Sequence, residues 1–194
     1  MSDGKRPADA DSLLETRVDG EVVFKGKLLD VRRDTVRLPD GRLSTREYIV
    51  HPGAVLIVPV LPDGRLVMLR QFRYPVDRVM IEFPAGKLDP GETPLATAQR
   101  ELREEAGYTA TRWRPFGRVH SVVGYSTEAI EFFVAEGLTH VGAALDDGEF
   151  LEIGTMSADE MLAALDRGEI TDAKTLAALL LYVRQARAAS GPRR

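Results

Sequence analysis

Three glutamates fall on one face of a predicted helix, where their carboxylates could hold a cation. Capping signals place this helix at residues 94–106, and Gly107 ends it. Because each helical residue advances about 100° around the axis, Glu101, Glu104 and Glu105 lie on the same side. Carboxylates at this spacing repel one another, so we expect a cation among them. The chain has no cysteine, and the remaining oxygen ligands favour Mg²⁺ or Mn²⁺.

A glycine-containing loop precedes this helix and can complete the site. Residues 86–91 can fold back against the carboxylate face. Glu92 lies at the helix N-terminus, where the positive end of the helix dipole favours an anion. A charged helix face on its own is most often simply solvated, so the wider pattern decides the interpretation.

Residues 86–108 resemble the Nudix box. In that pattern a glycine, five residues, a glutamate and seven residues precede Arg-Glu-U-x-Glu-Glu-x-Gly-U, where U is apolar. The last position holds Tyr108, a mild departure. The resemblance implies a Nudix hydrolase of the α/β class, an α/β/α sandwich with a mixed sheet that hydrolyses nucleoside diphosphate derivatives with a divalent metal. The other fixed positions are occupied by Gly86, Glu92, Arg100, Glu101, Leu102, Glu104, Glu105 and Gly107.

The resemblance also implies roles for individual residues of the box. Glu101 and Glu105 would be the main metal ligands, and Glu104 would be a further ligand or would orient the others. The carbonyl of Ala85 would be another ligand. Arg100 would pair with the carboxylates and keep the helix face rigid.

Hydrolysis of a diphosphate also requires a base that takes a proton from water. A bound divalent cation would neutralise the oxygens that gain charge and would acidify water. In the family the base can come from the helix glutamates or from a later loop. Glu128 is the loop candidate here, and Glu131 is a weaker alternative.

Three segments outside the box resemble the ADP-ribose pyrophosphatase branch of the family. They are a β-rich N-terminal extension containing LPDGRLSTREYIVHPGAV, the segment RQFRYP at residues 70–75, and EFPAGKLDPGE leading into the box. The resemblance implies a homodimer whose N-terminal β units cross to the partner and help to build the nucleoside pocket. It also implies that Arg73 holds the diphosphate, that Arg46 and Glu47 lie near the base or terminal ribose, and that Glu82 approaches the sugar.

The substrate remains open between two nucleoside diphosphate sugars. ADP-ribose, cleaved to AMP and ribose 5-phosphate, is the first expectation. ADP-ribose hydrolases commonly carry Ser-Pro-Gly after the box, whereas residues 121–124 read Ser-Val-Val-Gly. Another derivative such as GDP-mannose is therefore the alternative. A non-catalytic nucleotide-sensing module is a remote third reading, because such a module could lose the carboxylates that this chain retains.

Composition excludes some partners and compartments. The 26 Lys and Arg residues against 30 Asp and Glu give a net charge of −4, which argues against a nucleic acid partner. No stretch approaches the roughly eighteen apolar residues that span a bilayer, and the polar N-terminal segment resembles no targeting signal. We therefore expect a cytoplasmic protein without a membrane partner.

The chain is predicted to have two domains. A small antiparallel β unit at residues 1–50, with flexible residues up to about 11, would precede a Nudix domain at 51–194. The segment LPDGR occurs twice, and each copy is predicted to close a hairpin. Strands are expected at 54–61, 79–83 and 129–134. A second helix is expected to begin at a capping box at Ser157 and to end at Gly168. A third helix is expected at 172–188, with an apolar stripe of Leu176, Leu179, Leu180 and Val183.

Overall fold

The computed structural model describes residues 12–145 and 148–189. The flexible ends expected from the sequence, residues 1–11 and the final SGPRR, lie outside this part of the chain. Within the described part, no helix is both long and apolar enough to cross a membrane.

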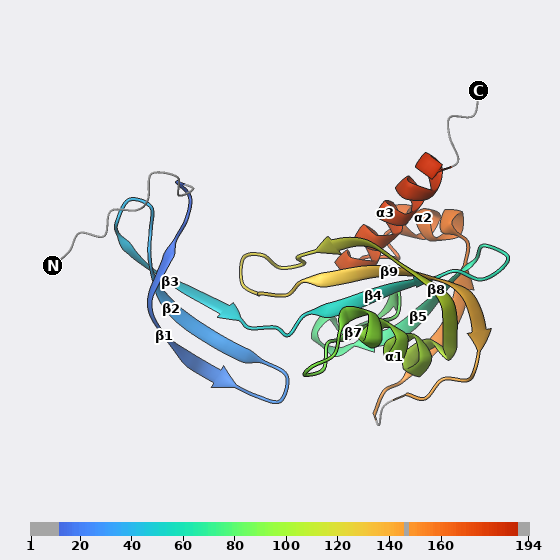
Figure 1. Cartoon of the computed structure of the whole chain (residues 1–194), viewed down its shortest axis with the longest axis horizontal. Helices are drawn as coiled ribbons and strands as arrows, with labels where there is room; N and C mark the ends of the chain where they lie inside the picture. Colours follow the sequence, from blue (N-terminus) through green and yellow to red (C-terminus); the bar gives the residue numbers. More distant parts are fainter. Residues whose placement is uncertain (1–11, 146–147, 190–194) are drawn as a thin grey trace. The chain divides into compact units, whose positions relative to one another are not determined.

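The chain forms two compact units (Figure 1). The first contains the residues up to His51 together with 122–127, and the second contains the remainder. The segment 122–127 belongs to the first unit because Ile49 exchanges backbone hydrogen bonds with it. The Ile49 N–H donates to the Tyr125 carbonyl at 2.9 Å, and the Thr127 N–H donates to the Ile49 carbonyl at 3.0 Å.

The N-terminal unit is a three-stranded antiparallel sheet in the order β1-β2-β3. The first LPDGR segment turns the chain between β2 and β3. Gly41 adopts a φ of 89° there, and its N–H donates to the Leu38 carbonyl at 2.9 Å. Because the two strands pair along their length, this predicted hairpin is confirmed. The strands are β1 (Thr16–Lys25), β2 (Asp30–Arg37) and β3 (Leu43–Ile49).

Most apolar side chains of this N-terminal sheet are exposed. Val22 is 49% exposed and Phe24 is 55% exposed on β1, and Leu28 in the following turn is 67% exposed. Only Asp34 and Val36 are buried among the described residues of the unit. Three strands without a covering helix cannot shield this much apolar surface from water.

A mixed four-stranded sheet forms the centre of the second unit, in the order β7-β4-β9-β8. Strand β4 runs parallel to β9, and the other pairs are antiparallel. Every residue of β4 is buried, as its continuous apolar sequence predicts. Its side chains alternate between two core clusters, with Leu56 in one and Ile57 in the other. The strands are β4 (Ala54–Pro59), β7 (Ala85–Lys87), β8 (Tyr108–Val119) and β9 (Ile130–His140).

A separate antiparallel sheet has the order β10-β5-β6. The second LPDGR segment forms a tight turn before it, in which the Leu61 N–H donates to the Arg65 carbonyl at 2.9 Å. The predicted hairpin does not extend beyond this turn, because Val60 and Leu66 form one isolated antiparallel bridge and the strands β4 and β5 lie in different sheets. Both edges of β4 are already paired with β7 and β9, so β5 pairs with β6 and β10. The elements are β5 (Leu66–Arg73), the 3₁₀ helix η1 (Tyr74–Val76), β6 (Arg78–Glu82) and β10 (Leu151–Met156).

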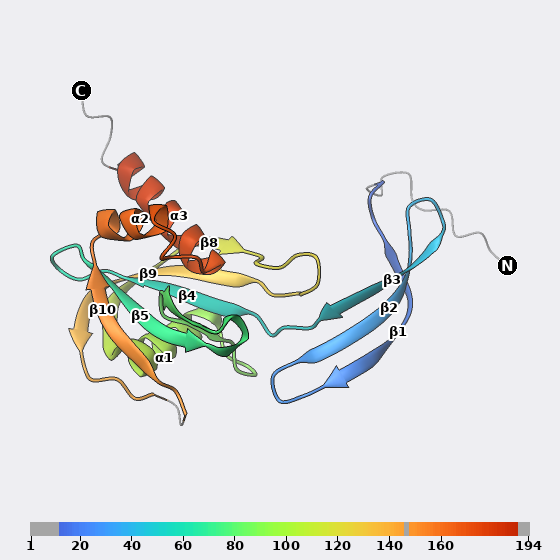
Figure 2. The same cartoon turned by 180° about the vertical axis from the view of Figure 1, so that it is seen from behind.

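Helices cover both faces of the central sheet (Figures 1 and 2). Helix α1 packs Leu102 into the cluster that contains Ile57, whereas α2 and α3 pack Met161 and Leu179 into the cluster that contains Leu56. The result is an α/β/α sandwich with a mixed sheet, which confirms the expected fold class. The helices are α1 (Pro94–Ala106), α2 (Ala158–Asp166) and α3 (Ala173–Ala189).

Local signals set the ends of α1 and the start of α2. The Thr93 hydroxyl accepts a hydrogen bond from the Ala96 N–H at 3.3 Å, and Gly107 adopts a φ of 72° that ends α1. The predicted bounds of this helix are therefore confirmed. The predicted capping box of Ser157 and Glu160 is also present.

Helix α3 confirms only part of the predicted stripe. Leu179 is fully buried and Val183 packs against the same core cluster, whereas Leu180, which the sequence pattern predicted to be buried, is 45% exposed. Thr175 and Ala178 are fully buried beside Leu179. These residues follow the helical spacing of three and four, so the helix is rotated relative to the stripe of its largest side chains.

Candidate active site

A pocket of about 530 Å³ in the second unit gathers carboxylates from four segments, one of which is the loop before α1 with Asp89. Glu128 comes from the connection between β8 and β9, and Glu149 comes from the segment before β10. Arg73 lines the pocket from β5, and Lys174 lines it from α3. Acidic and cationic groups therefore share one cavity. Helix α1 contributes Glu101, Glu104 and Glu105.

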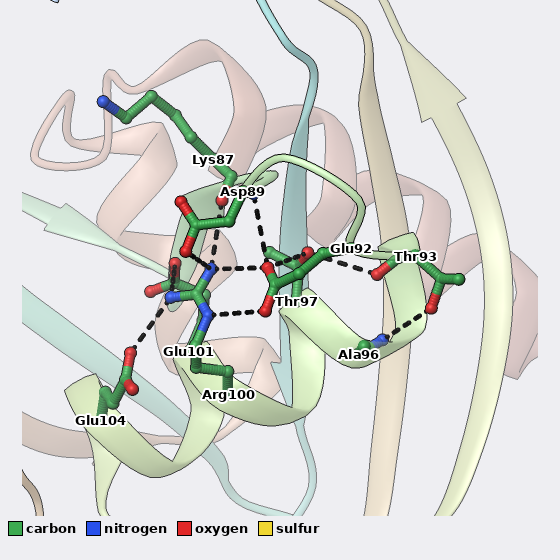
Figure 3. Close-up of polar contacts among 9 residues, drawn as sticks. All are labelled: Lys87, Asp89, Glu92, Thr93, Ala96, Thr97, Arg100, Glu101 and Glu104. Carbon is green, nitrogen blue, oxygen red and sulfur yellow. Dashed lines mark hydrogen bonds and ion pairs between the residues drawn. The ribbon is translucent and has the colours of Figure 1, made fainter.

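The guanidinium of Arg100 connects the helix to the preceding loop (Figure 3). Its Nη1 donates to Glu101 at 2.8 Å and to Glu104 at 3.1 Å. Its Nε and Nη2 donate to the two oxygens of Glu92 at 3.1 and 3.0 Å, and Nη2 also donates to the Lys87 carbonyl at 3.2 Å. One cation thus holds three carboxylates and the loop backbone.

Glu92 is fixed at the N-terminus of α1. Besides the bonds from Arg100, it accepts a hydrogen bond from the Thr97 hydroxyl at 2.8 Å. The hydrogen bonds from Arg100, followed by that from Thr97, lower the pKa of Glu92 to about 2. Glu92 therefore remains charged near neutral pH and orients Arg100 rather than taking part in proton transfer.

Glu105 is buried on the same helix without an ion pair to any described residue. Its side chain accepts a hydrogen bond from the Ala85 N–H at 2.9 Å, and the residue is 6% exposed. Burial, together with the negative charges of Glu101 and Glu149, raises the pKa of Glu105 to about 8. Burial also raises the pKa of Glu101. Two adjacent carboxylates are therefore costly to ionise unless a cation joins them.

Gly86 allows strand β7 to approach Glu101 closely. A Cβ atom at position 86 would lie 1.8 Å from Glu101 Oε1, which is far inside van der Waals contact. Backbone freedom is not the reason for glycine here, since its φ lies outside the left-handed region. The glycine is needed because a side chain would displace the carboxylate.

The donors of this pocket fit a hard divalent cation. All of the carboxylates offer oxygen, which Mg²⁺ and Mn²⁺ prefer, and burial raises the pKa of two of them, Glu101 and Glu105. Within the described residues, no three acidic or histidine side chains converge in a ready metal-binding arrangement. Arg100 instead satisfies Glu101 and Glu104.

A second ion-pair system forms another wall of the pocket. Arg73 donates to both oxygens of Glu82, from Nε at 2.7 Å and from Nη2 at 2.8 Å, and Lys174 binds the same carboxylate. Glu82, expected to approach a sugar, is 3% exposed and already holds these three donors. Arg73 is the last residue of strand β5, where it pairs with Arg78 of β6.

Arg46 and Glu47 lie in the N-terminal unit, where each makes an ion pair. Arg46 pairs with Glu15, and Glu47 accepts a hydrogen bond from Arg33 Nε at 2.9 Å. The two residues are adjacent on β3, so their side chains point to opposite faces of the sheet. A single face of this sheet cannot present both to one ligand.

The pocket also contains Glu149 and Lys174, which no sequence motif indicated as site residues. Glu149 lies in a segment without a motif or a periodic pattern, so only the fold places it beside the helical glutamates. Lys174 could be assigned to the first turn of a helix, because Asp172 is a capping residue. Nothing in the sequence indicated which strand that turn would meet.

The mixed-sheet sandwich and a pocket that combines carboxylates with cationic side chains suit an enzyme that acts on charged phosphate compounds. The chain belongs to the Nudix hydrolase family, because the profile described as the NUDIX domain matches residues 50–179. A second profile, described as the nucleoside diphosphate sugar hydrolase N-terminal domain, matches residues 15–49.

Similar proteins cover nearly the whole chain. An ADP-ribose pyrophosphatase of Bacillus subtilis is 39% identical over 87% of this chain and 92% of its own length. A methanol dehydrogenase activator of Bacillus methanolicus is 36% identical over 85% of this chain and 90% of its own. A solved structure described as an ADP compounds hydrolase has a TM-score of 0.82 and 26% identity, and the match covers 94% of this chain and 99% of that one.

The raised pKa of Glu105 predicts that replacing it stabilises the metal-free protein. The pKa of the Glu105 carboxyl is about 8 in the folded protein, above its usual value of 4.5. As pH rises from 4.5 to 8, the unfolded chain loses this proton before the folded protein does, so the carboxyl destabilises the fold increasingly. We expect metal-free Glu105→Gln to unfold at least about 3 °C above the parent at pH 8, with little difference at pH 4.5. Thermal unfolding in EDTA at both pH values measures this shift.

Glu152→Gln is the matched control, because Glu152 is exposed and its ion pair with Arg70 contributes little to stability. A melting temperature for Glu105→Gln below that of the parent at pH 8 would contradict the interpretation of Glu105 as an uncompensated buried carboxylate.

Proposed function

We propose that the protein hydrolyses the diphosphate linkage of ADP-ribose and releases AMP and ribose 5-phosphate. The observation that carries this proposal is a single pocket that contains the carboxylates of α1, among them the buried Glu105 without an ion pair to any described residue, and the cationic side chains of Arg73 and Lys174. The names of the Bacillus subtilis relative and of the similar solved structure support an ADP-linked substrate. GDP-mannose is the alternative substrate that the assay must include.

The proposed cofactor is Mg²⁺, with Mn²⁺ as a substitute. Glu101 and Glu105 would hold it, with Glu104 and the carbonyl of Ala85 as further ligands. When bound, the cation would supply charge neutralisation at the diphosphate and would acidify water. Arg100 would keep Glu101 in place through its hydrogen bond of 2.8 Å.

Arg73 is the proposed diphosphate ligand. Its Nε and Nη2 are bound to Glu82, whereas Nη1 makes no hydrogen bond to any described residue. The side chain is 41% exposed and lines the pocket. An arginine held along one edge of its guanidinium can offer the remaining N–H groups to phosphate oxygens without further loss of side-chain entropy.

We further propose Glu149 as the general base, in preference to Glu128. Glu149 has no hydrogen bond or ion pair within the described part of the chain, and its charge contributes to the raised pKa values of Glu101 and Glu105. Glu128 instead accepts a hydrogen bond from the Ser121 hydroxyl. In the reaction, water attacks phosphorus, the P–O bond of the anhydride breaks, and Glu149 takes the proton of the water.

The proposed compartment of the protein is the cytoplasm, as its nucleotide substrate suggests. The proposed assembly is a homodimer formed through the N-terminal β unit. The exposed apolar side chains of β1 and of the following turn support this assembly, because a second copy of the sheet could cover them. The approximately half-exposed Val22 and Phe24 are the central residues of this surface.

The first prediction of the proposed function concerns the metal ligand. Purified protein with Mg²⁺ should cleave ADP-ribose with a higher kcat/KM than GDP-mannose, dinucleotides or nucleoside triphosphates, and EDTA should abolish turnover. Glu105→Gln should lower kcat by at least about a hundredfold, because it removes a charged ligand without changing side-chain volume. Product chromatography measures each rate. Full activity of the folded variant would contradict the metal site, and a preference for triphosphates would contradict the substrate.

The second prediction compares the two candidate bases. Glu149→Gln should lower kcat by about a hundredfold or more, with a small change in KM, because a general base acts in the chemical step. Glu128→Gln should have a smaller effect. Steady-state kinetics of both variants decide between them, and a larger loss of kcat in Glu128→Gln would reassign the base to Glu128.

The third prediction concerns the assembly. Sedimentation at micromolar concentration should give a dimer, and Phe24→Glu should give a monomer by placing a charge in the apolar surface. Leu180→Glu is the control, since this α3 side chain is also close to half exposed and should leave the dimer intact. A fully active monomeric parent protein would refute the proposed assembly.

A further inference from the structure

The first turn of α3 is attached to strand β6 beside the pocket. The Asp172 carboxylate accepts hydrogen bonds from the Thr175 N–H at 3.0 Å and from Lys174 Nζ at 2.9 Å. The Thr175 hydroxyl accepts a hydrogen bond from the Phe83 N–H at 3.1 Å. Since Phe83 directly follows β6, this turn is connected to the strand that carries Glu82.

Glu82 is a buried carboxylate between two cations. Its side chain is 4% exposed, Arg73 binds it through two hydrogen bonds, and Lys174 binds the oxygen that Arg73 Nη2 also contacts. Burial raises the pKa of Glu82, but the hydrogen bonds from Arg73 and the charge of Lys174 outweigh it, so the pKa lies below its usual value. If this buried carboxylate lost one of its two cations, it would keep a single counterion and would be held less firmly in one orientation.

The orientation of Arg73 depends on this carboxylate. A planar guanidinium that donates two parallel hydrogen bonds to one carboxylate has its direction fixed by that carboxylate. With Nε and Nη2 engaged at 2.7 and 2.8 Å, Arg73 Nη1 has a defined position at the pocket wall. A neutral or rotated Glu82 would hold Arg73 through one bond at most.

We propose that Lys174 is a positioning residue, which neutralises Glu82 and thereby keeps Arg73 aligned to bind the diphosphate of the substrate. This inference rests on the proposed function, because it assigns the diphosphate to Arg73. Lys174 acts through Glu82 and Arg73 and makes no direct contact with the substrate. The C-terminal helix, which is distant in sequence from the glutamate helix, thus takes part in substrate binding.

The kinetic test replaces Lys174 with a side chain of similar length and no charge. Lys174→Met should raise the KM for ADP-ribose by about tenfold with a smaller change in kcat, whereas Lys174→Arg should restore most of the affinity by keeping the charge. Arg184→Met is the control, because it removes an exposed cation from the same helix, and its KM should not change. An unchanged KM in Lys174→Met would overturn the proposal.

A double-mutant comparison separates positioning from direct contact. If Lys174 acts through Arg73, then Arg73→Ala and the double variant Arg73→Ala/Lys174→Met should have KM values within about twofold of each other. A further tenfold increase in the double variant would show that Lys174 binds the substrate by itself and would overturn the proposal. Glu82→Gln should reproduce the effect of Lys174→Met. If the lysine variant folds poorly, this second variant tests the connection from Lys174 through Glu82 to Arg73.

A measurement without substrate distinguishes failure of this inference from failure of the proposed function. Hydrogen exchange of the Arg73 Nε–H, followed by NMR, should be slow in the parent protein because this proton is bonded to Glu82. It should become at least about tenfold faster in Lys174→Met and remain slow in Arg184→Met. Unchanged exchange in Lys174→Met would refute the positioning role, even for a protein that hydrolyses ADP-ribose. Accelerated exchange in a protein that hydrolyses no nucleotide sugar would refute the proposed function alone.

Discussion

Repulsion among partly buried carboxylates is the constraint on which the rest of this site depends. Glu101 and Glu105 lie on one face of α1, and burial raises the pKa of both. The helix must therefore be held firmly from its other side. Leu102 is fully buried in the core beneath it, Thr93 caps its first turn, and Gly107 ends it. Arg100 relieves part of the repulsion and connects the helix to the segment before it, where Gly86 leaves room for the Glu101 carboxylate. The energetic cost of gathering these carboxylates is acceptable if their ligand is a cation.

The two ion-pair systems of the pocket are built in different ways. Arg100 binds partners that are close in sequence, within the loop before α1 and in the second half of the helix, and could assemble as soon as the helix forms. The system of Arg73, Glu82 and Lys174 joins β5, β6 and α3, so it exists only after the sandwich has formed. The first system orders acidic groups and the second orders cationic groups. A diphosphate substrate needs both, because its own charge must be bound while water is activated.

Local signals in the sequence predicted much of the fold correctly. The caps of α1, the capping box of α2 and the hairpin between β2 and β3 each depend on a few neighbouring residues, and all three are present. The failed predictions depended on long-range pairing. The hairpin predicted at the second LPDGR segment does not extend beyond its turn, because β4 pairs with β7 and β9, which come much later in the chain. The exposed Leu180 shows that the largest apolar side chains of a helix need not define its packed face, since the shape of the sheet beneath selects the face that fits.

The sequence by itself determined the carboxylate face of α1, because helical geometry converts residue spacing directly into spatial proximity. The resemblance to the Nudix box implied that Arg100 pairs with these carboxylates. The sequence also determined that the ligand must suit oxygen donors, since the chain contains no cysteine. Only the tertiary structure decided which residues complete the pocket. Glu149 and Lys174 carry no local signal, and they reach the glutamate helix and Arg73 through the packing of β10 and α3. Burial likewise exists only in the folded chain. The sequence therefore could not predict the raised pKa of Glu105 or the lowered pKa of Glu82, which is bound by Arg73 and Lys174.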